Sequence, residues 1–305
     1  MNKLLVLLSL FFWLVPAFGQ QENRLPEADI PPAIILDAKQ INFADIFGNV
    51  TGTFVLYDDA EGITLVHNAR RAKERFSPWS TFEIPAILML LDARTISSVD
   101  ETVIWDKEAY PAHPALPAEL KEGWESDHCL RSAYHGYAVW LFLSQMKRMS
   151  PEEIRKYLDR FSYGQLDGEP SDGFWLGKEL RISAVEQVAF LRGMVDRLHG
   201  LKIDVIHQVL PVLVVEKGKD YQLVLKTGSG AANDQAFGWA VGYVERGGHR
   251  YYFAMNVEGH DYRLLTEQRH DIVRRVLDSF ALLSDSSSGV VPVKEAEAAI
   301  ESKNQ

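Results

Sequence analysis

The sequence predicts an α+β fold in which an antiparallel β-sheet is flanked by helices and accompanied by a helical lobe. Segments rich in β-branched and aromatic residues gather near both ends of the chain, at 50–67 and 221–257. Helical patterns fill the region between them, roughly residues 80–200. Strands and helices therefore do not alternate as they do in parallel α/β sheets, and we expect strands from both ends to share one sheet.

Two hairpins and one further strand account for the expected sheet. Residues 50–57 and 63–67 are β-rich and flank a short loop that contains Gly62, which is typical of a hairpin. The second hairpin joins 237–245 to 250–257, and residues 221–227 add a strand.

Helices are expected at 81–93, at 127–149 as one long helix, from Pro151 onward, at 183–198 and at 264–282. Ser150 followed by Pro151 is a strong helix start, because serine caps the first turn and proline suits its first position. Ser183 and Glu186 have the spacing of a capping box.

Composition excludes several classes of protein. Of 305 residues, 47% are hydrophobic and 24% are charged, as in an ordinary globular protein. The 32 basic and 42 acidic residues give a net charge of −10. This argues against a general nucleic-acid binder, because such a protein needs a basic face.

The single cysteine, Cys129, cannot form an internal disulfide, so stability must come from a hydrophobic core. Cys129 follows His128, but the spacing of these residues and of the neighbouring histidines fits no recognised zinc pattern. We therefore expect no metal and no cofactor, and interpret Cys129 as a buried thiol.

The first 19 residues are interpreted as a secretory signal peptide. Lys3 provides a short basic start, residues 4–17 are almost wholly apolar, and Ala17-Phe18-Gly19 has small residues at the spacing of a cleavage site. The apolar run is shorter than the roughly 20 residues of a bilayer span, which disfavours the alternative of an uncleaved anchor.

This interpretation gives a signal peptide over 1–19, a mature domain over 20–283 and a polar, flexible tail over 284–305. We expect a periplasmic or secreted protein without an integral membrane segment after cleavage.

Four motifs in a fixed order indicate the function. They are Arg-Phe-Ser-Pro-Trp-Ser-Thr-Phe-Glu-Ile-Pro at 75–85, Phe-Ser-Tyr-Gly at 161–164, the run from Phe-Trp-Leu to Glu-Gln-Val at 174–188, and Lys-Thr-Gly at 226–228. Together they closely resemble the class D (oxacillinase-type) serine β-lactamases of the penicillin-recognising superfamily. The resemblance extends from about residue 48 to 281 and implies a β-lactamase/transpeptidase-like fold.

The spacing of Ser80 and residue 83 suits acyl transfer. A serine hydroxyl is a poor nucleophile unless a base lies within hydrogen-bond reach. Residues three apart near a helix start share one helix face. Backbone N–H groups at that start can stabilise a developing oxyanion.

The resemblance also implies roles for individual residues. Ser80 would be acylated, and in the resembled family a carboxylated lysine three residues later is the base. The backbone N–H groups of Ser80 and Ser229 would form the oxyanion hole. The other implied positions are Tyr137, Lys226, Thr227, Gly228 and Arg269 for substrate binding, with Trp175 and Tyr163 in support.

The chain departs from this pattern at position 83, where the resembled family has its catalytic base. Glu83 presents a carboxylate but has no amine to be carboxylated. Its carboxyl carbon is three bonds closer to the backbone than a carbamate carbon, a difference of roughly 3–4 Å. We therefore expect it to lose direct contact with Ser80 unless a water bridges them. Tyr137 stands where the second-motif serine should be, Gln165 replaces an asparagine, and Ser229 replaces a bulky residue.

The leading hypothesis is a secreted protein that recognises β-lactams or peptidoglycan-type acyl-D-Ala-D-Ala groups through Ser80, with catalysis weak or lost. One alternative is an active β-lactam hydrolase that uses Glu83 or a bridged water as base. Another is a non-catalytic partner-binding protein on the same scaffold, for which the sequence specifies no protein partner.

Structural roles compete with these functional ones. Ser80 could be a plain helix N-cap, and Glu83 could complete a capping box with it. Glu83 could instead form an ion pair with Lys226 across the crevice. Trp175 could be a core residue, and Arg269 could lie on a solvated helix face. We expect the site in the crevice between the sheet and the helical lobe.

Overall fold

The computed structural model describes residues 41–114, 118–136, 138–196, 199–232 and 235–284. The expected signal peptide, most of the expected tail, and Tyr137 lie outside these residues. In this part of the chain, no helix is both long enough and apolar enough to cross a membrane.

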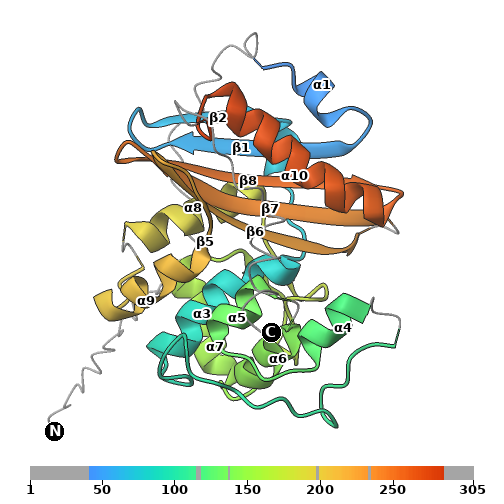
Figure 1. Cartoon of the computed structure of the whole chain (residues 1–305), viewed down its shortest axis with the longest axis vertical. Coiled ribbons are helices and arrows are strands. Elements are labelled where there is room, and N and C mark those ends of the chain that lie inside the picture. Colours follow the sequence, from blue (N-terminus) through green and yellow to red (C-terminus); the bar gives the residue numbers. More distant parts are fainter. Residues whose placement is uncertain (1–40, 115–117, 137, 197–198, 233–234, 285–305) are drawn as a thin grey trace, which may run out of the picture.

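Strands from both ends of the chain form one antiparallel sheet, which confirms the expected fold class (Figure 1). The order of the strands is β2-β1-β8-β7-β6-β5, so β1 pairs with the last strand, β8. The bounds are Thr51–Asp58 for β1, Ile63–His67 for β2, Val214–Lys217 for β5, Tyr221–Ala232 for β6, Gln235–Arg246 for β7 and His249–Gly259 for β8.

Helices cover both faces of the sheet and build the second lobe (Figure 1). Their bounds are α1 (Phe43–Phe47), α2 (Ala69–Ala72), the 3₁₀ helix η1 (Trp79–Phe82), α3 (Glu83–Asp92), α4 (Ala118–Trp124), α5 (Leu130–His135), α6 (Val139–Met146), α7 (Pro151–Phe161), α8 (Ala184–Val195), α9 (Ile203–Leu213) and α10 (Tyr262–Ser279). Between α7 and α8 the chain forms a small two-stranded sheet of β3 (Gln165–Leu166) and β4 (Leu180–Arg181).

Each face of the main sheet has its own hydrophobic core. Successive side chains of a strand point to opposite faces. Val224 therefore packs into the core shared with α8 and the lobe, whereas Leu223 packs into the core under α1 and α10. The lobe has no separate core, because its helices α3 and α5 to α9 join the first of these clusters. This shared core fixes the lobe against the sheet.

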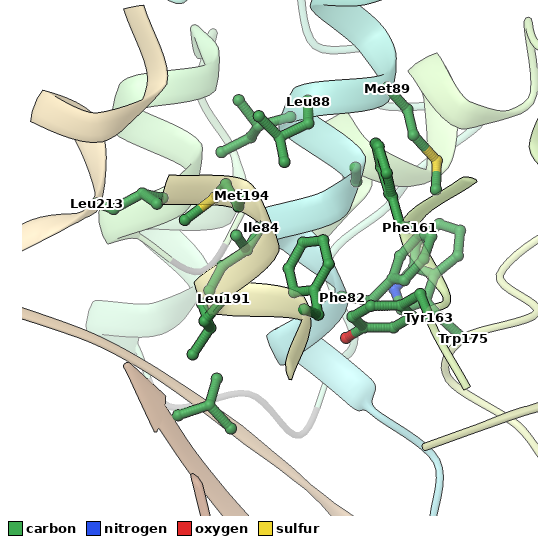
Figure 2. Close-up of a cluster of buried hydrophobic side chains, with 14 of the residues drawn as sticks. Phe82, Ile84, Leu88, Met89, Phe161, Tyr163, Trp175, Leu191, Met194 and Leu213 are labelled. Atoms are coloured by element: carbon green, nitrogen blue, oxygen red, sulfur yellow. The ribbon is translucent and has the colours of Figure 1, made fainter. Parts of the chain in front are cut away.

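Helix α3 runs through the centre of the lobe and sets the position of Ser80, which lies just before it. Every residue from Glu83 to Leu91 is buried, and a helix that is apolar on all sides belongs in a core. Figure 2 shows Phe82 at the start of this helix with Tyr163 and Trp175 beside it. The ring of Phe82 stacks on that of Trp175 with centroids 5.1 Å apart.

The expected caps of two helices are confirmed, but the expectation of one long helix over 127–149 is wrong. Ser150 and Ser183 both form capping boxes, at the starts of α7 and α8. The segment 127–149 forms two helices, α5 and α6, because Gly136 interrupts it: glycine disfavours helix, and its backbone is extended here. Cys129, expected to be buried, is half-buried and is the N-cap of α5.

The close pairing of β6 with β7 generates the first prediction. Gly242 lies opposite Leu225, and a Cβ at Gly242 would collide with the carbonyl oxygen of Val224. We expect Gly242→Ala to lower the free energy of unfolding by about 1–3 kcal/mol, the usual cost of overpacking. Gly123→Ala is the matched control, because a Cβ there meets nothing within 4 Å. Urea unfolding measures both, and equal losses would contradict the prediction.

Candidate active site

Ser80 and the Lys-Thr-Gly motif meet where η1 packs on β6. Ser80 is half-buried in η1, directly before α3. Side chains at alternate positions of a strand share a face. The positions of β6 that face η1 are Lys226, Gly228 and Gly230, because each of them is in contact with the segment that carries Ser80.

Three contacts set the register between η1 and β6. Each joins one residue of this segment to one of the alternate positions of β6. They are the ion pair of Glu83 with Lys226, the approach of Pro78 to Gly228, where a Cβ would lie 2.9 Å from the proline carbonyl oxygen, and the packing of the Trp79 indole on Gly230. The two glycines let the backbone of η1 lie directly against the strand.

The turn before Ser80 is held by backbone hydrogen bonds. Trp79 has a φ of 46°, a left-handed conformation that bulky residues rarely adopt. Its N–H donates to the Trp175 carbonyl at 3.1 Å. The N–H and the hydroxyl of Thr81 donate to the Pro78 carbonyl at 3.1 and 2.7 Å. These bonds hold a strained turn in the conformation that presents Ser80.

The two capping roles considered for this segment are wrong. Helix α3 begins at Glu83, and the residue before it, Phe82, makes no side-chain cap hydrogen bond. Ser80 lies inside η1, whose own N-cap is Pro78. A capping box requires the acid in the third helical position, whereas Glu83 occupies the first.

Glu83 forms a buried ion pair with Lys226 instead. The side chain of Glu83 is 4% exposed and that of Lys226 is 10% exposed. The Lys226 ammonium also donates to the carbonyl of Tyr134 at 2.7 Å and lies 4.5 Å from the centroid of its ring. The lysine of the Lys-Thr-Gly motif is therefore engaged on several sides within the protein.

Opposing effects act on the pKa of Glu83. Burial raises this pKa above its ordinary value, because the charged carboxylate loses water. The ammonium of Lys226 and its hydrogen bond lower the pKa, and a hydrogen bond with the Ser80 hydroxyl lowers it least of all.

The Ser80 hydroxyl thus lies close enough to Glu83 to lower its pKa, and direct proton transfer between the two side chains stays a prediction. In a 3₁₀ turn the side chains at positions i and i+3 nearly eclipse one another. The tight winding of η1 brings the shorter carboxylate near the serine.

Trp175 is fully in the core, and its indole N–H is buried there. The side chain is 1% exposed, and Nε1 has no hydrogen-bond partner among the described residues. Buried N–H groups nearly always have a partner. In the resembled family this tryptophan holds the carbamate of the base, whereas here the carboxylate of Glu83 engages Lys226.

Tyr163 lies in the wall behind η1. It is buried, and burial raises the pKa of its hydroxyl. The hydroxyl donates to Gln187 of α8 at 3.4 Å, and the amide of Gln187 donates to the Thr81 hydroxyl at 2.9 Å. Tyr163 therefore supports the nucleophile segment through α8.

Thr227 and Ser229 alternate with the positions that face η1, so their side chains point toward α10. Arg269 of α10 is 7% exposed. It donates to the Gly228 carbonyl at 3.2 Å and also to the Ser229 hydroxyl. The alternative that Arg269 lies on a solvated helix face is therefore wrong. Its role in binding a substrate carboxylate stays a prediction, as does the oxyanion-hole role of the Ser229 N–H.

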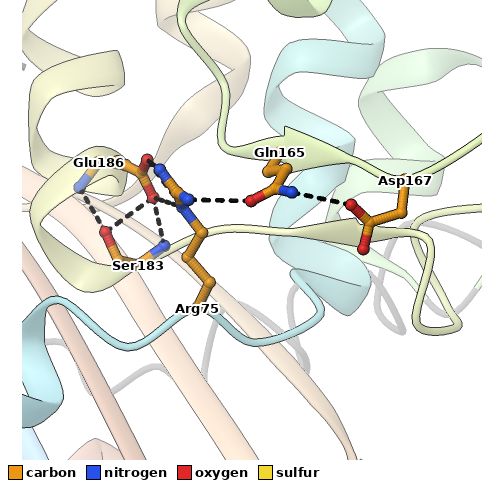
Figure 3. A network of polar contacts seen from close by, with 5 residues as sticks. All are labelled: Arg75, Gln165, Asp167, Ser183 and Glu186. Carbon is orange, nitrogen blue, oxygen red and sulfur yellow. Dashed lines mark hydrogen bonds and ion pairs between the residues drawn. The ribbon is translucent and has the colours of Figure 1, made fainter. Parts of the chain in front are cut away.

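A polar network holds the loop that precedes the nucleophile (Figure 3). Arg75 donates from Nε to both carboxylate oxygens of Glu186 at 3.0 Å, and from a second nitrogen to Gln165 at 3.0 Å. Glu186 is the acid that caps α8 with Ser183. Gln165 donates in turn to Asp167 at 2.9 Å. The glutamine that replaces the family's asparagine is therefore part of this structural network.

No metal site accompanies this geometry in the described part of the chain. A hollow of about 140 Å³ lies beside Trp175, and Leu143, Met146, Ile154 and Phe174 are among the residues that line it. Ser80 does not line it. No group of three or more His, Cys, Asp or Glu residues among those described could hold a metal ion.

Sequence reasoning did not identify Trp79, Tyr134 or Gln187 as part of the site. Trp79 directly precedes the nucleophile, and Tyr134 lies in the segment before Tyr137. Their proximity along the chain was a signal, but the direction of each side chain depends on the turn and on the break between α5 and α6. Gln187 becomes visible only once α8 is placed against η1.

Known proteins match both the sequence and the fold. Residues 52–278 match the family model of the penicillin binding protein transpeptidase domain. The chain therefore belongs to the penicillin-binding transpeptidase-domain family, among the class D β-lactamases and their relatives. The probable β-lactamase YbxI of Bacillus subtilis is 30% identical over 224 residues, which cover 73% of this chain and 80% of that protein.

A methicillin resistance protein and a penicillin receptor are also among the proteins that this chain resembles. The methicillin resistance protein MecR1 of Staphylococcus aureus is 32% identical over 249 residues, which cover 80% of this chain but only 40% of that protein. The class D β-lactamase of Sebaldella termitidis superposes with a TM-score of 0.73 at 27% identity, covering 80% of this chain and 97% of its own. The C-terminal domain of the Bacillus licheniformis BlaR penicillin receptor superposes with a TM-score of 0.72 at 26% identity, covering 80% of this chain and 96% of its own.

The burial of the Glu83–Lys226 pair predicts a large cost when one partner is removed. We expect Lys226→Met to lower the free energy of unfolding at neutral pH by about 3–5 kcal/mol, because an uncompensated charge stays buried. Adding Glu83→Gln should recover part of this loss. Lys147→Met is the control, because its ion pair with Asp172 is more than 60% exposed on both sides and should contribute about 1 kcal/mol or less.

The pH dependence of the Lys226→Met variant gives a further check of the same pair. Without the ammonium, burial is opposed only by the weaker effect of the Ser80 hydroxyl, so the pKa of Glu83 in the folded state lies above its ordinary value of 4.5. Stability is then greatest below the ordinary pKa and falls as pH rises toward the folded pKa. Urea unfolding at acidic and neutral pH measures this. A loss relative to the wild type that does not shrink at acidic pH would contradict it.

Proposed function

We propose that this protein recognises β-lactams, or the acyl-D-Ala-D-Ala groups of peptidoglycan, and becomes acylated at Ser80 with little or no hydrolysis. The observation that carries this proposal is the buried ion pair of Glu83 with Lys226 beside the nucleophile. Membership of the penicillin-binding family supports the substrate class. The predicted signal peptide at 1–19 supports action in the periplasm or outside the cell.

Acylation requires one proton to move. The Ser80 Oγ attacks the carbonyl carbon of the β-lactam, the strained C–N bond breaks, and the ring nitrogen takes up a proton. The Glu83 carboxylate interacts with the Ser80 hydroxyl, so it can accept the serine proton and return it to the nitrogen. Backbone N–H groups of Ser80 and Ser229 would stabilise the oxyanion.

Hydrolysis makes a second demand on the same base. A water must lose a proton to Glu83 as it attacks the ester carbonyl. The ammonium of Lys226 is paired with one oxygen of this carboxylate, which leaves less of the carboxylate free to orient and deprotonate a water. Slow hydrolysis therefore leaves the acyl-enzyme to accumulate.

The engagement of Lys226 also bears on substrate affinity. A lysine that donates to Glu83 and to the Tyr134 carbonyl has fewer hydrogens left for a substrate carboxylate. Arg269 would then be the main cation near the end of β6, although its guanidinium is partly engaged with Gly228 and Ser229. We expect weaker recognition than in a hydrolase of the same family.

The direct test is the mass of the intact mature protein after incubation with a penicillin. We expect an increase equal to the whole penicillin, because acylation opens the ring without losing an atom. The increase should persist for many minutes and be absent in Ser80→Ala. Rapid return to the original mass with consumption of the penicillin would show an active hydrolase. No adduct at all would favour a non-catalytic scaffold.

Restoring the family's base should restore turnover. Glu83→Lys supplies the amine, and a positioned base contributes roughly 10²–10⁴-fold, so penicillin hydrolysis should rise by about that factor. Carboxylation needs an amine, so bicarbonate should stimulate this variant and leave the wild type unchanged. A clear effect of bicarbonate on the wild type would point to another lysine, with Lys226 the first to examine.

Tyr137 is the second residue to change in this experiment. Tyr137→Ser restores the small hydroxyl of the resembled motif, and the double variant should exceed Glu83→Lys alone. The two effects should not add, because both residues act on one proton path. A folded double variant with neither hydrolysis nor an adduct would count heavily against a latent lactamase site.

A further inference from the structure

The residue before the nucleophile carries a side chain that the mechanism does not use. Trp79 is 7% exposed. Its ring lies 5.0 Å from that of Phe237, which in turn lies 4.6 Å from Phe76. Phe237 is opposite Gly230 in the pairing of β7 with β6. The indole is thus enclosed by the end of the β6–β7 hairpin on the face that carries Ser80.

Gly230 is the position that makes room for this indole. A Cβ on Gly230 would collide with the Cε2 and Nε1 atoms of Trp79. The ring therefore occupies the volume directly over Gly230, where any residue other than glycine would place its side chain. It remains there although the Trp79 backbone is in a left-handed conformation, which a bulky residue adopts only when its surroundings hold it.

The register of η1 on β6 locates Ser80 relative to this ring. On one side of the serine Glu83 is paired with Lys226, and on the other side Trp79 packs on Gly230. Strand β5 pairs with β6 only as far as Val224, so beyond it β6 is paired on one side, by β7. An acyl group attached to Ser80 beside the later part of β6 must therefore lie next to the indole.

We propose that Trp79 is a specificity-determining residue that restricts acylation at Ser80 to donors with a small substituent next to the reacting carbonyl. The indole is packed on Phe237 and Gly230 with little of its surface exposed, so it forms a wall and not a platform for stacking. A bulky substituent would need the volume over Gly230 that the ring fills. This inference rests on the proposed acylation and adds the size of the acyl group to it.

The test compares two penicillins that share one nucleus. Both carry an acylamino group on the carbon next to the reacting carbonyl. Beside the amide carbonyl of this group, benzylpenicillin has a methylene and methicillin has a doubly ortho-substituted ring. Second-order rate constants for adduct formation are measured by intact mass for the wild type, Trp79→Ala and Trp79→Phe. We expect the wild type to favour benzylpenicillin. Trp79→Ala should shift the ratio toward methicillin by about tenfold or more, and Trp79→Phe by less.

Two control experiments separate this effect from general loosening. Phe237→Leu weakens the packing behind the indole but leaves the ring over Gly230, so the ratio should stay near that of the wild type. Gly230→Ala should lower the urea midpoint in the wild type and much less in Trp79→Ala, because the collision partner is then absent. This coupling is measured without any substrate.

The outcomes distinguish this inference from the proposed function. If the wild type forms no adduct with either penicillin but Trp79→Ala does, the acylation proposed for the natural protein fails and the blocking role of Trp79 stands. If Trp79→Ala leaves the ratio unchanged, or forms no adduct where the wild type forms none, the inference is overturned. Equal effects of Gly230→Ala with and without Trp79 would also overturn it.

Discussion

The site depends on one packing constraint, the direct contact of η1 with a single face of β6. Because side chains of a strand alternate between faces, only Lys226, Gly228 and Gly230 can meet the segment that carries Ser80. Two of the three are glycines, and this allows the backbone of the turn to approach the strand. The third places a cation against Glu83. The positions of the nucleophile, the carboxylate and the indole all follow from this register.

The same constraint governs the surroundings of Glu83, which stands where the resembled family has a lysine. A glutamate in the first turn of a fully buried helix would be costly on its own. Lys226 stands at the matching position of β6 and neutralises it. The two residues thereby form an internal ion pair, and losing either partner would leave a buried charge uncompensated. Trp175 keeps its place in the core, but its N–H is left without a partner among the described residues.

Much of this could be predicted from sequence because the signals were local. Ser150 and Ser183 indicate helix starts because each caps the first turn of its helix, and the strands are indicated by their β-branched and aromatic residues. The errors arose where tertiary contact decides. Gly136 divides a segment that looked continuous, and Glu83 pairs with Lys226 instead of forming the capping box that its spacing from Ser80 suggested. The burial of Arg269 follows from the packing of α10 on the sheet, which no local pattern contains.

The strand order also has a consequence for how the chain folds. β1 lies between its hairpin partner β2 and β8, which is about two hundred residues later in the chain. The N-terminal hairpin therefore cannot take its place in the sheet until the last strand is available, and a contact so distant in sequence makes folding slow. The helices from α3 to α9 rely on shorter-range contacts and can collect around α3 earlier. The contact of η1 with β6 also joins segments distant in sequence, so we expect the site of Ser80 and Lys226 to assemble late in folding.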